Sequence, residues 1–228
     1  MKSPFPEDIA FVLRERKAGD EATVAGELLP QERALLAAEA SPKRIADFAL
    51  GRSCARAALR QAGAWSEGPP PLLLQRGRAP IWPAGYVGSL AHTHGAAAAA
   101  AAPSARYGAL GVDLEPRGRD ATAAGSRILR PEERTALAGG TREAVILWFC
   151  VKESIYKALH PLTDVYLGFQ DVRVLPSTGL AGLTAGGSGT LDWELLKPCG
   201  AQFPAGMRGR AGWSVSGPWL VAGVWLKA

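Results

Sequence analysis

The segment Gly111-Val112-Asp113-Leu114-Glu115-Pro116 is the part of this chain whose pattern says most about its fold. Apolar and acidic residues alternate along it, and this alternation predicts a β-strand, in which successive side chains point to opposite faces. Asp113 and Glu115 are therefore expected on one face of the strand, and Val112 and Leu114 on the other.

A second segment, Phe149-Cys150-Val151-Lys152-Glu153-Ser154-Ile155-Tyr156-Lys157, predicts a helix. Glu153 and Lys157 are four residues apart and share a helix face. Together with the strand they provide three carboxylates and a lysine. Mg²⁺ prefers oxygen ligands and commonly completes its coordination shell with substrate phosphates, so this set could hold the cation beside a phosphate.

Each of these residues also has a purely structural interpretation. Carboxylates near a strand end are more often solvated than catalytic. Glu153 and Lys157 could form an exposed helix pair that contributes only ~0.2–0.5 kcal/mol. Taken one at a time, the residues leave both interpretations open.

The flanking sequence predicts both helices and strands. Residues 28–59 indicate two helices, the second beginning at Ser41-Pro42, because serine caps a helix and proline is tolerated at its first position. Two further helices are expected to begin at Arg130-Pro131 and at Thr141. Strands are predicted at residues 72–75, at residues 107–115, which include the acidic segment, and at residues 219–226. The chain shows no sharp linker and no obvious repeat.

The run Ala96–Ala102 gives conflicting signals. Alanine has the highest helix propensity, which favours a helix. The run lies between Gly95 and Pro103, however, and has little more than the length of a strand. If it is a strand, it could form a hairpin with residues 107–115.

Length and composition fit a globular protein of 228 residues, with room for one large domain or two small ones. No uncharged apolar run is long enough to span a bilayer, and residues 1–16 lack the pattern of a signal peptide. Cys54, Cys150 and Cys199 are too few and too scattered for a disulfide framework or a zinc site. We therefore expect reduced thiols in a cytoplasmic protein.

The net charge is +5, and basic residues gather in the first half of the chain. They indicate either a solvated surface or a site for an anionic ligand or an acidic partner. No nucleic-acid motif accompanies them. His92 and His94 lack two further zinc ligands, so a structural or phosphate-contacting role is expected for His92. The basic residues in question are Lys43, Arg44, Arg52, Arg56, Arg60, Arg76 and Arg78.

In combination, the motifs resemble the 4′-phosphopantetheinyl transferases of the surfactin type and the enterobactin-synthase component D type. The resemblance covers residues 28–175, and its most specific part is the pair of motifs GxDxE and FxxKESxxK. One departure is Ala91, where many members of this class have serine or threonine before the histidine. The matching segments are residues 51–56, 78–85, 88–93, 111–115, 148–154, 157–163 and 167–172.

The resemblance implies that the chain moves the phosphopantetheine arm of coenzyme A to a serine of an apo acyl or peptidyl carrier protein. The other product would be adenosine 3′,5′-bisphosphate. Asp113, Glu115 and Glu153 would bind Mg²⁺, and Lys157 would neutralise or protonate the leaving phosphate. Glu153 or a metal-bound water would accept the proton of the serine.

The resemblance also assigns the basic residues to the phosphates of coenzyme A. Arginine suits such a role because its planar fork binds phosphate oxygens bidentately. Arg56, Arg78 and His92 would be the main contacts, with Arg52, Lys43 and Arg44 as weaker candidates. Thr93 could supply the hydroxyl contact that Ala91 lacks, and Lys157 would also touch the ligand.

The fold implied is α+β, with two similar α/β halves packed as a pseudo-dimer and the ligand between them. The halves would comprise residues 1–105 and 106–228, and the chain would act as a monomer. This picture favours a strand for Ala96–Ala102. A catalytically idle coenzyme A-binding or carrier-docking module is the alternative function, and a general Mg²⁺ phosphohydrolase is a distant third. The likeness slightly favours carriers of siderophore or other secondary-metabolite synthesis.

Overall fold

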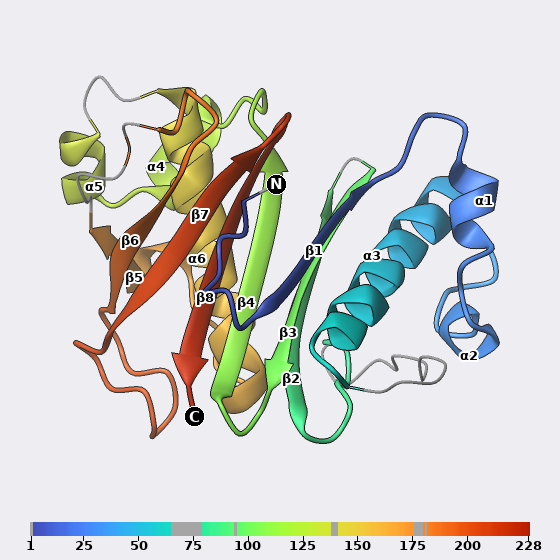
Figure 1. Cartoon of the computed structure of the whole chain (residues 1–228). Coiled ribbons are helices and arrows are strands. Elements are labelled where there is room, and N and C mark those ends of the chain that lie inside the picture. Colours follow the sequence, from blue (N-terminus) through green and yellow to red (C-terminus); the bar gives the residue numbers. More distant parts are fainter. Residues whose placement is uncertain (1, 65–78, 94, 138–140, 176–179, 181) are drawn as a thin grey trace. The chain divides into compact units, whose positions relative to one another are not determined.

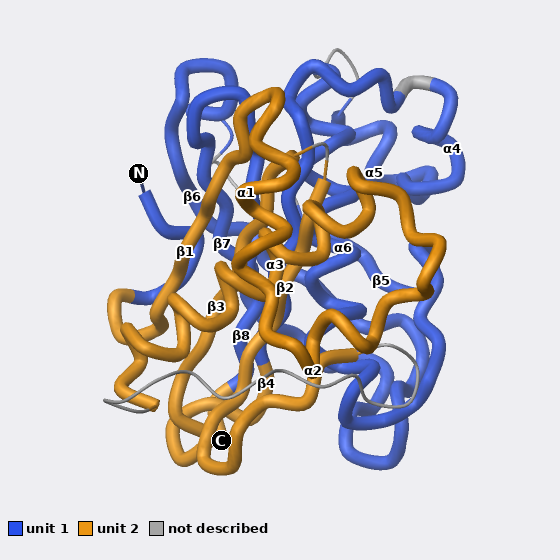
Figure 2. Tube along the Cα trace, turned by 90° about the vertical axis from the view of Figure 1, so that its right-hand side faces the viewer, with its two compact units in different colours: residues 1–6, 110–226 blue, residues 7–109, 227–228 orange. Residues whose placement is uncertain are grey.

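The computed structural model describes residues 2–64, 79–93, 95–137, 141–175, 180 and 182–228 (Figure 1). They divide into two compact units, coloured separately in Figure 2. One unit comprises Glu7–Ala109 and Lys227–Ala228, and the other comprises Met1–Pro6 and Leu110–Leu226. We call them the α3 unit and the α6 unit, after the long helix in each.

The α3 unit contains a three-stranded sheet in the order β1-β3-β2. Helix α3 packs against this sheet, and two short helices precede it in the chain. Ser41 is the N-cap of α3, and its side chain accepts a hydrogen bond from the amide of Arg44, as the sequence predicted. The elements are β1 (Ala10–Glu15), α1 (Glu21–Ala25), α2 (Pro30–Arg33), α3 (Pro42–Gln61), β2 (Tyr86–Thr93) and β3 (Ala96–Pro103).

The alanine run forms β3, so the prediction of a buried strand is confirmed. β3 is the middle strand, antiparallel to β1 on one side and to β2 on the other. Ala97, Ala99 and Ala101 pack into one hydrophobic cluster with residues of α3. Hydrogen bonding along both edges therefore overrides the helix propensity of alanine, and the small side chains let α3 lie close to the sheet.

The predicted hairpin between this strand and residues 107–115 is wrong. β3 instead forms its hairpin with β2, and β1 occupies its other edge. The strand that begins at Tyr107 is β4 (Tyr107–Pro116), which neighbours β8 in the other sheet. Because β1 had not been predicted, the second edge of β3 had looked available.

The α6 unit contains a five-stranded sheet in the order β4-β8-β7-β6-β5 (Figure 1). Its core includes three fully buried tryptophans, Trp148, Trp193 and Trp213. The N-terminal segment belongs to this unit, and the ring of Phe5 lies 6.2 Å from that of Trp225. The remaining elements are η2 (Thr122–Ala124), α4 (Gly125–Ile128), α5 (Pro131–Ala136), α6 (Arg142–Thr163), η3 (Phe169–Asp171), β5 (Val172–Leu175), β6 (Ser188–Leu195), β7 (Arg208–Ser216) and β8 (Trp219–Lys227).

Most of the predicted elements are confirmed. α5 follows Arg130, α6 follows Thr141, and β8 corresponds to the predicted last strand. The α+β class is also confirmed, since each unit combines an antiparallel sheet with one long helix. The strand expected at residues 72–75 lies outside the described residues, and the division into 1–105 and 106–228 stays a prediction.

A membrane-spanning helix was not expected from the sequence. Among the helices of the described residues, none has the length and apolar character needed to cross a bilayer.

Candidate active site

Strand β4 carries the two carboxylates of the first motif into the interior. Asp113 is 7% exposed and Glu115 is 8% exposed. Val112 and Leu114, which alternate with them, are also buried. The strand is thus covered on both faces, and the interpretation of these carboxylates as solvated side chains does not hold.

Helix α6 brings Lys157 to the first of these carboxylates. Its Nζ donates to Asp113 Oδ1 at 2.6 Å and to the carbonyl oxygen of Val112 at 3.2 Å. The sequence had suggested an exposed pair between Lys157 and Glu153 within the helix. The structure instead joins Lys157 to the neighbouring strand.

Gly111 allows this approach of helix and strand. A Cβ atom at Gly111 would lie 1.8 Å from the carbonyl oxygen of Ser154, so any side chain would push α6 away from β4. The hydroxyl of Ser154 donates to the carbonyl oxygen of Ala222 on β8 at 3.1 Å. The glycine of GxDxE and the serine of KES therefore have packing roles that position the charged residues beside them.

The carboxylates also influence one another electrostatically. Burial raises the pKa of Glu153, and the negative charge of Asp113 raises it further, while Lys157 opposes both effects. The pKa of the Cys150 thiol is raised well above its usual value by burial and then by Asp113 and Glu115. Asp113, Glu115 and Glu153 therefore contribute to one region of negative potential.

The predicted metal ligands are not arranged as a finished metal site. Within the described ranges, no group of three or more His, Cys, Asp or Glu residues is placed to hold a metal ion. Lys157 occupies one oxygen of Asp113, and Arg119 forms an ion pair with Glu115 Oε1 at 2.5 Å. Asp113 Oδ2 is buried and accepts no hydrogen bond from the residues that the structure describes.

A small cavity of about 210 Å³ lies beside this region in the α6 unit. Its lining is mainly apolar and includes Ile146, Phe149 and Phe169. The guanidinium of Arg119, which also lines the cavity, stacks over the ring of Phe149 at 5.0 Å. An uncharged, partly apolar group would fit such a lining.

The α3 unit holds a second, basic group of predicted site residues. Arg44, Phe48 and Arg52 follow one another at four-residue spacing on α3 and share a face. The guanidinium carbons of Arg52 and Arg44 lie 4.5 Å and 6.0 Å from the ring centre of Phe48. His92 on β2 lies beside them, with its Nε2 at 3.5 Å from Arg44 Nη1.

Arg52 and Arg56 have different surroundings although both are on α3. Arg56 donates to both oxygens of Glu32 at 2.6 and 2.7 Å and to the carbonyl oxygen of Glu27 at 2.7 Å. Arg52 is only 3% exposed, and burial lowers its pKa. Its Nε has no hydrogen-bond partner among the described residues. Arg56 is therefore committed to a structural ion pair, whereas Arg52 is a buried cation without one.

The remaining predicted residues have varied positions. Thr93 is half-buried near the end of β2, and Lys43 is exposed in the first turn of α3. Arg78 lies outside the described residues, as does His94. The predicted roles of these residues stay predictions.

Sequence reasoning missed a buried glutamate in each unit. Glu32 is fully buried and pairs with Arg56, and Glu133 is buried and pairs with Lys152. Each glutamate lies in a Pro-x-Glu-Arg sequence, at residues 30–33 and 131–134. This short repeat was the available signal, and it had been overlooked.

Comparison with known sequences connects this geometry to a family. The family model described as the 4′-phosphopantetheinyl transferase N-terminal domain matches residues 31–102. The model of the 4′-phosphopantetheinyl transferase superfamily matches residues 109–198. Together they cover more than half of the chain.

Three curated relatives have similar sequences. The 4′-phosphopantetheinyl transferase Svp of Streptomyces mobaraensis is 41% identical over 152 residues, which are 64% of this chain and 60% of the relative. Npt of Nocardia iowensis is 38% identical, with 72% of each chain covered. PptT of Mycobacterium tuberculosis is 36% identical, with 68% of each chain covered. Npt and PptT are also named 4′-phosphopantetheinyl transferases.

Proposed function

This chain belongs to the 4′-phosphopantetheinyl transferase family, and we propose that it transfers the 4′-phosphopantetheine arm of coenzyme A to a serine hydroxyl of an apo carrier protein. The resemblance inferred from the motifs is thus confirmed. The products are a holo carrier and adenosine 3′,5′-bisphosphate. The observation that carries the proposal is the ion pair of Lys157 with Asp113, in the region where Glu153 has a raised pKa. No match supports the idle-module alternative.

Glu153 and Lys157 are proposed to perform the proton and charge transfers. A carboxylate with a raised pKa is a stronger base, so Glu153 suits the task of accepting the serine proton, directly or through water. The serine oxygen then attacks the phosphorus attached to the pantetheine, and the bond to the nucleotide phosphate breaks. Lys157 neutralises the charge that develops on the departing phosphate.

Asp113, Glu115 and Glu153 are proposed to hold Mg²⁺. The buried Oδ2 of Asp113 supports this fit, because carboxylate oxygens are the ligands that Mg²⁺ prefers. Metal binding would compete with Lys157 for Asp113 and with Arg119 for Glu115. When bound, the cation would neutralise charge on the diphosphate.

The nucleotide phosphates are proposed to bind the basic group of the α3 unit. A buried guanidinium whose Nε has no hydrogen-bond partner among the described residues is suited to bind a phosphate, and this favours Arg52. Arg44 and His92 lie next to it in the same unit. We rank Arg56 below them because Glu32 already holds it. Arg78 keeps the main phosphate-binding role predicted from the sequence, and Thr93 and Lys43 keep their supporting roles.

The cavity beside Phe149 is proposed to take the pantetheine arm. That arm is uncharged and carries methyl groups, which suits the apolar lining. The acyl or peptidyl carriers are proposed to be those of secondary-metabolite synthesis, and the chain to act as a cytoplasmic monomer. Successive matches of two family models within one chain support the monomer.

The decisive experiment incubates the chain with coenzyme A, Mg²⁺ and several apo carrier proteins. We expect intact-mass spectrometry to detect one added phosphopantetheine on a carrier. EDTA should abolish the addition, and excess Mg²⁺ should restore it. No added mass on any carrier would refute the transferase, whereas full activity in EDTA would refute the metal role alone.

A further inference from the structure

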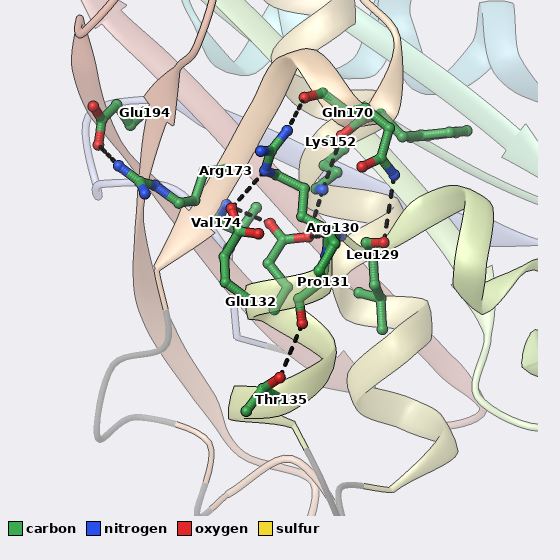
Figure 3. Close-up of polar contacts among 12 residues, drawn as sticks. Leu129, Arg130, Pro131, Glu132, Thr135, Lys152, Gln170, Arg173, Val174 and Glu194 are labelled. Atoms are coloured by element: carbon green, nitrogen blue, oxygen red, sulfur yellow. Dashed lines mark hydrogen bonds and ion pairs between the residues drawn. The ribbon is translucent and has the colours of Figure 1, made fainter.

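Lys152 and Glu133 form a buried ion pair that the proposed mechanism does not use. Lys152 Nζ lies 2.7 Å from Glu133 Oε2, and each side chain is 1% exposed. Lys152 is on α6, directly before Glu153, and Glu133 is in the first turn of α5. Figure 3 shows Lys152 beside Arg130, Leu129 and Gln170, at the start of α5.

The hydrogen bonds of Lys152 are all used. In addition to Glu133, its Nζ donates to the carbonyl oxygens of Ile128 and Phe169, each at 2.9 Å. An ammonium group has three N–H donors, so none remains for a ligand. Lys152 therefore has no direct part in binding coenzyme A.

Glu133 uses both of its oxygens and extends the connection. Its Oε1 accepts from the amide of Val174 at 2.7 Å, and its Oε2 accepts from the amide of Arg130 at 2.8 Å as well as from Lys152. The pair thus ties α6 to the end of α4, the start of α5, η3 and β5. Gln170, next to Phe169, donates to the carbonyl oxygen of Leu129 (Figure 3). It also donates to the carbonyl oxygen of Arg127.

Stability alone is a weak reason for such a pair. Removing two charges from water costs so much that well-packed apolar residues of similar size often serve as well or better. A buried ion pair with many hydrogen bonds favours one arrangement of the elements that it joins. Any shift of one element would break several of these hydrogen bonds at once. The pair is therefore suited to hold α6 in one position.

That position determines where the reacting side chains lie. Consecutive helix residues are rotated by about 100°. Lys152 thus points toward α5 and η3, and Glu153, the next residue of α6, extends from a different side of the helix. Lys157, one turn further along, reaches Asp113 at 2.6 Å. A rotation or slide of α6 would move Glu153 and Lys157 together.

We propose that Lys152 and Glu133 are positioning residues, which hold α6 at the rotation and height where Lys157 reaches Asp113 and where Glu153 takes its proposed place in the same site. The proposal rests on the roles assigned to Glu153 and Lys157 above. It gives the lysine of KES a function distinct from that of the glutamate that follows it. Gly111 and Ser154 hold α6 against the sheet, and the ion pair holds it from the other side.

Two substitutions of Glu133 separate position from charge. Glu133→Gln keeps the length of the side chain, and its one oxygen can still accept from Lys152 and from the amide of Arg130, although its NH2 group cannot accept from the amide of Val174. Glu133→Asp keeps the charge but is too short to reach Lys152 and Val174 together. We expect kcat to fall by about tenfold or more in Glu133→Asp and by less than about threefold in Glu133→Gln, because small displacements of reacting groups cost large factors in rate. KM for coenzyme A should change by less than about twofold in both, since uniform binding is unaffected.

Lys152→Met provides the larger perturbation, and Lys197→Met is its control. Lys197 forms an ion pair with Asp171 at a similar 2.7 Å, but its side chain is 42% exposed. Folding is checked for each variant by circular dichroism and by the unfolding midpoint. We expect folded Lys152→Met to lose kcat at unchanged KM, and Lys197→Met to match the native chain. If Lys152→Met does not fold, the comparison of Glu133→Asp with Glu133→Gln decides.

Three outcomes would overturn the proposal. One is a native kcat in folded Glu133→Asp, another is a larger loss in Glu133→Gln than in Glu133→Asp, and the third is loss of activity only in proportion to unfolded protein. Glu153→Gln distinguishes this failure from failure of the proposed site. If Glu153→Gln is inactive while both Glu133 variants are native-like, only the positioning role is wrong. If Glu153→Gln is fully active, the assigned catalytic role of Glu153 is wrong instead.

Discussion

The two long helices, α3 and α6, treat their basic residues in parallel ways. Each helix has one basic side chain that forms an ion pair with a buried glutamate. Arg56 of α3 pairs with Glu32, and Lys152 of α6 pairs with Glu133. Each helix also has a second basic side chain, and the surroundings of this second side chain differ between the two helices. Lys157 on α6 reaches the carboxylate of Asp113, whereas the guanidinium of Arg52 on α3 stacks on Phe48 and its Nε has no hydrogen-bond partner among the described residues.

The difference lies in what surrounds these second basic residues. On α3 the neighbours include Phe48, Arg44 and His92, and burial lowers the pKa of Arg52 although the charge of Glu32 partly opposes this effect. On α6 the neighbours are carboxylates, which raise the pKa of Glu153. The same helix-on-sheet plan therefore produces a basic group of side chains in one unit and a negatively charged region in the other.

Asp113→Ala should have the largest effect on activity. It removes the partner of Lys157 and one proposed metal ligand, so we expect kcat to fall by about 100-fold or more. The unfolding midpoint should stay close to that of the native chain. Asp192→Ala is the matched control, because that carboxylate is 58% exposed. Full activity of Asp113→Ala would remove the acidic site from the mechanism.

Arg56→Met tests the structural member of the α3 pair. The substitution leaves Glu32 buried and without its cation, which should lower the free energy of unfolding by about 3–5 kcal/mol. Urea unfolding at neutral pH measures the loss, and the exposed Arg60→Met serves as control. If Arg56→Met instead raised KM for coenzyme A at native stability, Arg56 would be a phosphate ligand as the sequence first suggested.

Arg52→Met should show the opposite pattern. Loss of a charge-assisted bond to phosphate should raise KM for coenzyme A by roughly tenfold at unchanged kcat. Stability should be maintained, because the substitution removes a buried cation whose Nε has no hydrogen-bond partner among the described residues. Steady-state kinetics with varied coenzyme A checks the first expectation. A native KM would leave Arg52 as a cation stacked on Phe48 with no ligand role.

The smallest effect concerns the buried cysteine of α3. Burial raises the pKa of the Cys54 thiol from 9.0 to about 12, so the folded chain keeps a proton that the unfolded chain loses. Stability from this group is therefore complete below pH 9 and declines as the pH rises toward 12. At pH 10 the loss should be about 1 kcal/mol. The drop in urea midpoint between pH 8 and pH 10 should be smaller in Cys54→Ala, and an equal drop would contradict the assignment.

Much of the fold was predictable from local signals. Ser41-Pro42 and Arg130-Pro131 mark helix starts because capping depends on adjacent residues alone. The strand at Ala96–Ala102 could not be predicted from local signals alone, since the propensity of alanine favours a helix. Its pairing with β1 and β2 makes it a strand. The wrong hairpin had the same origin, because the partner of a strand edge lies far away in the sequence.

The candidate site divides in a similar way. The types and spacing of Asp113, Glu115, Glu153 and Lys157 were readable because they lie in two short motifs. The ion pair between Arg56 and Glu32 could not be predicted from the sequence, since the two residues are on different helices. The packing role of Gly111 also depends on Ser154, which is distant in the chain.

By itself the sequence determined the family, the α+β class and the set of chemical groups, because short motifs and periodicity carry that information. Only the tertiary structure decided which charged side chains form internal ion pairs and which do not. The physical reason is that the fate of a charge depends on the partners and the burial it meets after folding. Asp113 and Lys157, chosen from sequence as separate candidates, became one ion pair for that reason.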